Sequence, residues 1–563
     1  MELRGKLFSA SYCDPINKVQ VVLFSSPKKA ISKTFSNNEG YWFLEERRKY
    51  HHIEFSKPGY ITKKIRNLNF RIVRLLENKL FLYQNKIWCR AGDYITAYVN
   101  SSTDFQARLI RKGLEEKQIL DFGYQKRFLQ SVPNKFFTET GLNWKKNFRY
   151  KIPSDLQSGL YVLEVKNEKK EKFSAPLVVY REPKKRNEKI LVVVNTTTWL
   201  TYNLWGGRSR YRTFEIENRY KAISKILPDY QGANRLLKRE TILDAEKIFT
   251  FFASLVPFKI KEKIKESVFG HQSKKEVASK HLSWETKPIS LKRPISCCNL
   301  EQENVLDNYT SHLAENEWRL IAWLDREKIK FDVIADIQLE KQDLLKKYKA
   351  VVIAGHSEYW SKKMFYNLKK YHEWHKSWII NLSGNTFHGL VKYTKKFQLQ
   401  FIGMPLFSLI PRKDNFMNIK DYSKGSEDYS KCSHYRVIQK KHQFFENVRF
   451  QHGDQLGTKC LNKETQKNSE FYLPERSGLS IGLTGEGASG WETDNLANKQ
   501  DKRFSLLAKG ALTSGADMFF KKGTKEYGHI FSAGSITYIG SLLIDKEIST
   551  LTKNVIHQAL RTN

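Results

Sequence analysis

The sequence predicts two β-sandwich modules followed by an α/β domain with a mainly parallel sheet. Three observations lead to this fold class. The first third of the chain contains short alternating apolar runs separated by turn residues, as in all-β proteins. A charged, proline-containing stretch at 182–188 looks like a linker. Beyond it, continuous apolar runs alternate with helical patterns. We therefore expect domains at 1–76, 77–182 and 188–563.

Residues 1–76 have the pattern of short strands joined by tight turns. Apolar and aromatic runs occur at 19–24 and 41–44, and the turn sequences Asn-Glu-Gly and Pro-Gly follow at 38–40 and 58–59. This order resembles the regulatory-like β-sandwich that is appended to carboxypeptidases. The resemblance implies a structural module, so we assign no chemistry to it.

Residues 77–182 give a second all-β pattern. The segment 93–99 alternates between apolar and polar residues, and a Ser-Gly turn at 158–159 leads into the apolar run 160–165. These features predict a second β-sandwich.

The remaining chain changes in character at residue 188. Continuous apolar runs, typical of strands buried on both faces, occur at 189–194, 331–335, 350–354 and 378–382. Helical patterns lie between the later runs, which predicts crossover connections and a parallel sheet. The charged, helix-prone residues 212–290 interrupt this order, and we expect them to form a helical insertion.

The bulk composition narrows the class of protein. The chain has 563 residues, of which 40% are hydrophobic, and no apolar run approaches the ~18 residues that cross a bilayer. The N-terminus lacks the apolar core of a secretory signal, so we expect a cytoplasmic protein. The six cysteines are scattered, and the adjacent Cys297 and Cys298 are interpreted as reduced thiols.

The net charge of +38 allows an anionic partner such as a polysaccharide. The lysines, however, are spread along the whole chain and interleaved with acids, and no nucleic-acid-binding signature accompanies them. We therefore expect no specific nucleic acid partner. A general lysine bias is therefore the favoured explanation of the charge, and a specific anionic partner is the alternative.

Polar and aromatic residues gather where three of the predicted strands end. In open α/β sheets ligands bind outside the carboxyl ends of strands, so these segments are the candidate site. The most prominent is Gly355-His356-Ser357-Glu358-Tyr359-Trp360. The other two are the segments 195–209, with Asn203 and Trp205, and 383–388, with Asn385 and His388.

The turn after Leu382 has the strand–turn–helix pattern of a nucleophile elbow. Class I glutamine amidotransferase-like domains carry a cysteine there, whereas this chain has Asn385. Ser383 lies on the strand side of the turn, where its hydroxyl would be less exposed. The missing nucleophile shifts the interpretation towards a metal site.

The candidate metal ligands are His356, Glu358, Tyr359, His388 and Glu492. A phenolate, an imidazole and a carboxylate together suit iron above other metals. No compact motif such as H-E-x-x-H is present. The residues alone therefore also allow the alternative that Tyr359 and Trp360 cap a strand and that His388 is an ordinary surface histidine.

The chain resembles the large subunit of N,N-dimethylformamidase and its relatives. The segments that carry the resemblance agree in order and cover most of residues 190–560. They are Tyr202-Asn203-Leu204-Trp205-Gly206-Gly207-Arg208-Ser209, Gly355-His356-Ser357-Glu358-Tyr359-Trp360-Ser361, Ser383-Gly384-Asn385-Thr386, Gly490-Trp491-Glu492-Thr493-Asp494 and Phe531-Ser532-Ala533-Gly534-Ser535.

The resemblance implies a fold similar to class I glutamine amidotransferases and hydrolysis of amides with a mononuclear iron. In that family two tyrosines and a glutamate hold the metal. The first tyrosine maps onto Tyr359, the glutamate onto Glu492, and the second tyrosine falls where this chain has His388. His388 then replaces the phenolate, or the metal binds differently, or activity is lost.

The leading hypothesis is an iron-dependent hydrolase of a non-peptide amide C–N bond, with metal ligands Tyr359, His388 and Glu492. We expect His356, Glu358 and Asn385 to position water or move its proton. We expect substrate-binding roles for Asn203, Trp205 and Trp360. The resemblance allows a small partner subunit or a homo-oligomer, and the substrate would be a small amide. The alternative is a non-catalytic or glycan-associated binding protein that keeps the fold.

Overall fold

The computed structural model describes most of the chain outside one long central segment. The described residues are 2–46, 48–66, 72–134, 137–183, 190–207, 209, 288–296, 313–394, 398–403, 414–421, 432–460, 487–490 and 492–561. The predicted helical insertion at 212–290 lies outside the described residues except for 288–290, and Cys297 and Cys298 also lie outside them.

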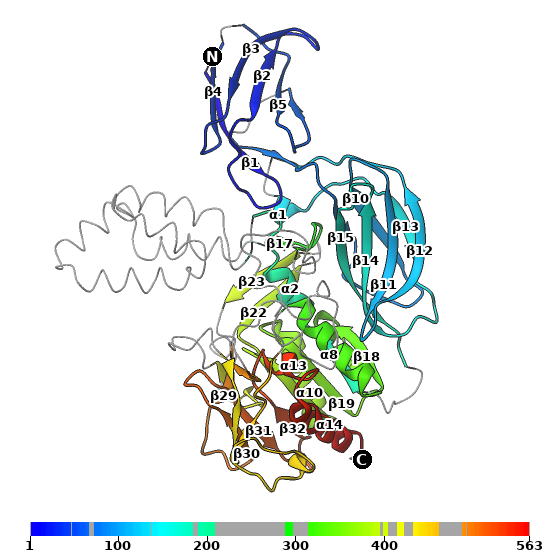
Figure 1. Cartoon of the computed structure of the whole chain (residues 1–563), viewed down its shortest axis with the longest axis vertical. Helices are drawn as coiled ribbons and strands as arrows, with labels where there is room; N and C mark the ends of the chain where they lie inside the picture. The colour runs from blue at the N-terminus through cyan, green and yellow to red at the C-terminus, as the bar shows by residue number, and fades with distance from the viewer. Residues whose placement is uncertain are drawn as a thin grey trace, which may run out of the picture.

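Two facing sheets form from the first 75 residues (Figure 1). Alternation of buried and exposed residues along the strands gives them one shared core, which includes Leu7, Val21 and Trp42. The strands of the first sheet are β4 (Tyr41–Glu45), β1 (Glu2–Ser9) and β7 (Ile72–Leu75), and those of the second are β3 (Ala30–Phe35), β2 (Gln20–Phe24), β5 (His52–Ser56) and β6 (Lys63–Ile65).

A second pair of sheets follows between residues 81 and 180. The three-stranded sheet holds β13 (Phe148–Lys151), β10 (Tyr94–Asn100) and β8 (Phe81–Gln84), and the five-stranded sheet holds β12 (Lys117–Gln125), β11 (Phe105–Lys112), β14 (Gly159–Asn167), β15 (Lys172–Tyr180) and β9 (Trp88–Arg90). Their core also takes in Trp205 and Phe137, the latter on the short helix α1 (Phe137–Thr140). The domain boundaries at 76 and 182 stay a prediction.

A nine-stranded sheet organises the rest of the chain. Its order is β18 (Phe331–Ala335), β16 (Ile190–Val194), β19 (Ala350–His356), β21 (Trp378–Gly384), β32 (Ile530–Ser532), β31 (Asp517–Lys521), β30 (Phe504–Gly510), β26 (Tyr435–Val437) and β27 (Gln455–Leu456). The first five strands are parallel. From β32 onwards every neighbouring pair is antiparallel.

The predicted α/β class with a mainly parallel sheet is therefore wrong. Strands make up 42% and helices 17% of the described residues, spread over many sheets. The likeness to class I glutamine amidotransferases is not supported. The physical reason is local: β30 and β31 are joined by a turn of six residues, which returns the chain antiparallel, whereas a parallel neighbour would need a long crossover.

Helices cover both faces of the parallel strands. Along β16, Val192 and Val194 pack into a core with α8 (Ala314–Arg326) and α14 (Lys546–Arg561), while Leu191 and Val193 face α10 (Lys362–Trp374). Burial on both faces explains why this strand is apolar throughout. The remaining helices are α2 (Thr196–Thr201), η3 (Asp336–Glu340), α9 (Gln342–Leu345), η5 (Gln443–Phe445) and α13 (Tyr538–Ser541).

Small sheets complete the architecture beside the ends of the parallel strands. One has the order β17 (Ile289–Ser290), β23 (Gln398–Gly403), β22 (Gly389–Thr394) and β20 (Tyr359–Trp360), and two pairs are β24 (Ile419–Asp421) with β29 (Asp494–Leu496) and β25 (Cys432–Ser433) with β28 (Ser489–Gly490). Among the described helices, none has the length and apolar character needed to cross a membrane.

Candidate functional site

The segment that follows β19 is fixed tightly to the neighbouring strand end. His356 is the last residue of β19, and the Ser357 N–H donates to Ser383 Oγ at 2.8 Å. The N–H groups of Phe387 and Gly389 donate to the carbonyl oxygens of Ser357 and Glu358 at 3.1 and 2.8 Å. These bonds hold His356 and Glu358 in place beside the 383–389 turn.

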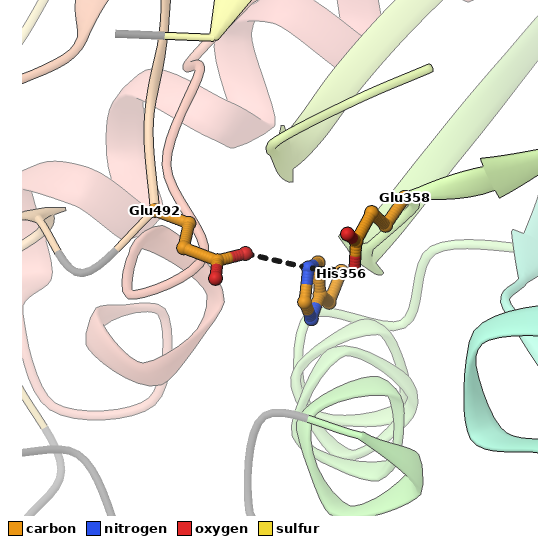
Figure 2. Close-up of side chains that lie close together, drawn as sticks. All are labelled: His356, Glu358 and Glu492. Atoms are coloured by element: carbon orange, nitrogen blue, oxygen red, sulfur yellow. Dashed lines mark ion pairs between the residues drawn. The ribbon is translucent and has the colours of Figure 1, made fainter. Parts of the chain in front are cut away.

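His356, Glu358 and Glu492 converge into one cluster (Figure 2). His356 Nε2 lies 2.7 Å from Glu492 Oε2 and 3.2 Å from Glu358 Oε2. His356 is 1% exposed, so the imidazole is desolvated. Burial lowers the pKa of His356, but the two carboxylates more than offset it and raise the pKa to about 10.

Two tyrosine hydroxyls extend this cluster on the side of Glu358. Tyr202, directly after α2, donates its hydroxyl to Glu358 Oε2. The Tyr359 hydroxyl donates to the Tyr202 hydroxyl at 3.2 Å. The Tyr202 ring stacks on His356 with 5.7 Å between ring centroids. The Tyr359 hydroxyl, the Tyr202 hydroxyl and the Glu358 carboxylate therefore form a chain of hydrogen bonds.

Glu492 reaches the cluster from the loop between β28 and β29. The Asp494 N–H donates to the Gly534 carbonyl at 2.8 Å, and Asp494 Oδ1 accepts the Thr386 N–H at 3.0 Å. Asn385 donates from Nδ2 to Glu492 Oε2 at 2.9 Å. The turn carrying Asn385 and the loop carrying Glu492 are thus bound to each other.

Asn385 presents an unpaired acceptor at the site. Its Oδ1 atom is buried and has no hydrogen-bond partner among the described residues, although Nδ2 is bonded to Glu492. Asn385 has a φ of +52°, a conformation that asparagine tolerates better than most residues. A buried carbonyl oxygen without a donor is costly, so Oδ1 is available to accept a hydrogen bond.

A buried carboxyl group beneath the site anchors α2. Glu317 Oε1 accepts from Asn195 Nδ2 at 2.8 Å, and Glu317 Oε2 accepts from Trp199 Nε1 at 3.1 Å. Asn195 is the N-cap residue of α2, Trp199 lies within the helix, and Tyr202 follows its last residue. Glu317 therefore fixes the helix that carries the Tyr202 phenol.

The predicted substrate-binding residues Asn203, Trp205 and Trp360 are buried and make contacts within the protein. Asn203 is fully buried and donates to the Pro294 carbonyl at 2.8 Å. Trp205 packs in the core of the second pair of sheets, 5.6 Å from the Phe81 ring centroid. Trp360 is fully buried and donates to the Ser357 carbonyl at 2.9 Å. These contacts hold the site's backbone, and a direct contact with substrate stays a prediction.

The predicted metal ligands are only partly brought together. Glu492 lies in the cluster, and Tyr359 is linked to it through Tyr202. His388 is half-buried and is not a member of the His, Asp and Glu group that the described residues form. The second phenol that lies beside Tyr359 is Tyr202. Its signal was in the sequence, because it follows β16, whose end lies beside that of β19.

Two overlapping sets of side chains at the site have possible metal-ligating atoms close together: His356, Glu358 and Glu492, and Glu358, Tyr202 and Tyr359. One atom from each of His356, Glu358 and Glu492 lies within 4.8 Å of the other two. Ligands bound at ~2.1 Å and at right angles around one ion are ~3.0 Å apart. The 3.2 Å between the Tyr202 and Tyr359 hydroxyls and the 3.2 Å between Glu358 and His356 are close to that spacing.

Comparison with solved structures gives only remote similarities. A putative ThuA-like protein from Bacteroides uniformis shares 8% identity, covering 46% of this chain and 87% of that chain, with a TM-score of 0.26. Alpha-2-macroglobulin from E. coli shares 12% identity over 31% of this chain and 11% of that chain, with a TM-score of 0.13. Neither score supports an argument. Comparison with curated proteins gives no match.

The family comparison is more informative. The model of the family described as N,N-dimethylformamidase beta subunit-like, C-terminal, matches residues 118–248 and 265–550, which is well over half of the chain. The match includes the strand ends that bear His356, Glu358 and Glu492. The resemblance predicted from the sequence motifs is thereby confirmed, and the chain belongs to the N,N-dimethylformamidase beta subunit-like family.

Proposed function

We propose that the chain is an iron-dependent hydrolase of the C–N bond in a small non-peptide amide. The family match supports an amide hydrolase in general. The observation that carries the metal proposal is the contact of two phenols and a carboxylate, with Tyr202 hydrogen-bonded to both Glu358 and Tyr359. This is the kind of donor set that the family resemblance implies, with Tyr202 in place of His388 and Glu358 in place of Glu492.

Glu358, Tyr202 and Tyr359 would hold the ion. When bound, iron would polarise the amide carbonyl oxygen and lower the pKa of a bound water. Hard oxygen donors of this type suit iron in its trivalent state. Gly389 makes room for one of them, because a Cβ there would lie 2.4 Å from Cδ1 of the Tyr359 ring.

His356 and Glu492 form the pair that would move protons. Glu492 Oε2 lies 2.7 Å from His356 Nε2 and so orients the imidazole. Hydrolysis of an amide requires a proton to leave the attacking water and another to reach the departing nitrogen, and a paired imidazole and carboxylate can exchange both. Neither role requires a nucleophilic side chain, in agreement with Asn385 at the turn.

Asn385 would orient the water or the substrate. Its unpaired Oδ1 accepts an N–H or O–H, and its bond to Glu492 places that acceptor beside the proton-moving pair. A primary or secondary amide or a water molecule can provide the donor.

Metal analysis of matched tyrosine variants tests the ligand assignment. We expect the purified full chain to hold close to one iron per chain, with a visible phenolate-to-iron absorption band. Tyr202→Phe and Tyr359→Phe should each weaken or shift the band. Tyr393→Phe is the control, because its hydroxyl lies 2.7 Å from Thr197 Oγ1, away from the three oxygens. Metal-free protein after growth in iron contradicts the proposal.

Kinetics separate the proton-moving pair from the metal donors. In His356→Gln and Glu492→Gln we expect iron to be retained while amide hydrolysis falls by about a hundredfold or more, since general acid–base catalysis is worth ~10²–10⁴. Loss of iron in Glu492→Gln would instead make Glu492 a ligand, as the sequence predicted. The glycan-associated alternative stays a prediction.

A further inference from the structure

A hollow in the surface lies far from the candidate active site, near the starts of the parallel strands. It has a volume of about 390 Å³, and Phe520, His442 and His529 are among the residues that line it. The His529 carbonyl accepts the N–H of Ile379 at the beginning of β21, whereas the candidate active site lies beyond the end of that strand. Six residue steps along β21 separate the two by ~20 Å.

Both histidines of this hollow have a fixed tautomer. The Phe444 N–H donates to His442 Nδ1 at 3.3 Å, and the Gly523 N–H donates to His529 Nδ1 at 3.1 Å. Burial lowers the pKa of each imidazole, and Lys522 lowers that of His529 further. A neutral imidazole that accepts at Nδ1 carries its proton on Nε2, so both rings can offer an N–H donor.

The ring of His529 is held rigidly for this role. It stacks on Trp378 with 4.3 Å between centroids and 12° between planes, and it also stacks on Phe520. His442 contacts Phe520 edge-on at 5.5 Å. The two donors are thus built into the aromatic core and do not belong to mobile surface side chains.

The rim of the hollow is cationic. Lys441 and Lys522 both line it, and neither forms an ion pair with a described residue. None of the residues lining the hollow is acidic, while Gln443, Ser505 and Gln558 add neutral polar groups. Two lysines with no ion pair among the described residues, two imidazole N–H donors and a lining without acidic residues favour an anion.

We propose that this hollow binds the phosphate group of a small molecule. A tetrahedral dianion presents several oxygens, and it can accept from both imidazole Nε2–H groups and both lysines at once, whereas a planar carboxylate offers only two oxygens. The volume exceeds what a phosphate group fills, and the lining includes one apolar side chain, Phe520, which an organic part could contact. This site is independent of the proposed amide hydrolysis.

Calorimetric titration of the full chain tests the proposal, at constant ionic strength, with inorganic phosphate, phenyl phosphate and benzoate as probes. We expect saturable binding of both phosphates below about 10 mM and much weaker binding of benzoate. Tighter binding of phenyl phosphate than of inorganic phosphate identifies a phosphate ester as the ligand, and equal binding identifies the free ion.

Matched variants locate the binding. Lys441→Gln combined with Lys522→Gln should raise the dissociation constant for phosphate by about tenfold or more, since charge-assisted hydrogen bonds are the strong ones. His529→Phe keeps the ring stack, removes the Nε2–H donor and should also weaken binding. Lys509→Gln, an exposed lysine on β30, is the control and should leave binding unchanged.

Three results would overturn the proposal. They are no saturable binding of either phosphate, equal weakening by Lys509→Gln, and binding of a long anionic polysaccharide without binding of small phosphates. The lysine variants are on the surface and should fold, so the test does not depend on the His529 variant.

Discussion

Burial of the Glu315 carboxyl group should make the folding stability of the chain depend on pH, and Glu315→Gln should remove this dependence. The residue lies in the first turn of α8 and is 0% exposed, and neither carboxyl oxygen has a hydrogen-bond partner among the described residues. Burial raises the pKa of Glu315 from 4.5 to about 8. The perturbation that we consider is Glu315→Gln, which keeps the shape and removes the ionisation.

The sign follows from the raised pKa of Glu315. The folded state holds the proton more tightly than the unfolded chain, so its contribution to stability is complete below pH 4.5 and is lost as the pH rises towards 8. One pKa unit is worth ~1.4 kcal/mol, so the ionisation of Glu315 should cost the folded state a few kcal/mol between pH 5 and pH 8. Because glutamine does not ionise, the Glu315→Gln variant should not lose this stability between pH 5 and pH 8.

Urea unfolding of both proteins at pH 5 and pH 8 measures the difference. We expect the free energy of unfolding of Glu315→Gln, relative to the natural chain, to rise by a few kcal/mol between the two pH values. An unchanged difference would refute the reasoning, because it would mean that the carboxyl group is solvated or paired in the folded state.

Glu327 provides a matched control at the other end of α8. Although burial opposes it, the hydrogen bond from Lys553, at 2.6 Å, lowers the pKa of Glu327. The stability that Glu327 contributes is present above pH 4.5 and lost only as the pH falls below that value. Glu327→Gln should therefore destabilise the chain equally at pH 5 and pH 8.

Three further predictions concern contacts between modules and the candidate site. Arg111 donates to Asp325 at 2.8 and 2.9 Å, and this pair joins the second pair of sheets to α8. Arg111→Ala should therefore lower the free energy of unfolding by about 2 kcal/mol in urea titrations. An unchanged unfolding midpoint would contradict this prediction. In Gly389→Ala, the added Cβ would displace the Tyr359 ring. We expect amide hydrolysis to fall by about a hundredfold with little change in melting temperature. Full activity of this variant would rule out a role for that ring. Chelation should abolish activity and lower the melting temperature, and iron should restore both, whereas activity in metal-free protein would exclude the iron proposal.

The sequence singled out two members of the buried cluster, His356 and Glu358, but it did not predict the mixed sheet. His356 and Glu358 were recognisable because a continuous apolar run leads directly into a polar and aromatic segment, and such a run must be a buried strand with its end at the sheet edge. The strand β30 was not recognised, because a short run followed by a turn does not reveal whether the next strand is parallel or antiparallel.

The second metal ligand was assigned to His388 from the family resemblance, and that assignment stays a prediction. The structure shows that a phenol remote in sequence, Tyr202, contacts Glu358 and Tyr359. Adjacent parallel strands bring their carboxyl ends together, and β16 pairs directly with β19. Chain distance therefore says little about which residues meet at this edge, and the order of strands in the sheet decides it.

The residues that follow β32 explain how Glu492 reaches His356. The residues after β32 bond to the loop that carries Glu492: Thr493 forms a bridge with Ser535, and the Ile536 N–H donates to the Glu492 carbonyl at 3.3 Å. These contacts come from the residues between β32 and the short helix α13, so the end of the central strand β32 itself holds the loop that carries Glu492. One member of the His356–Glu492 pair therefore comes from the end of β19, and the other from a loop that is fixed beside the end of β32.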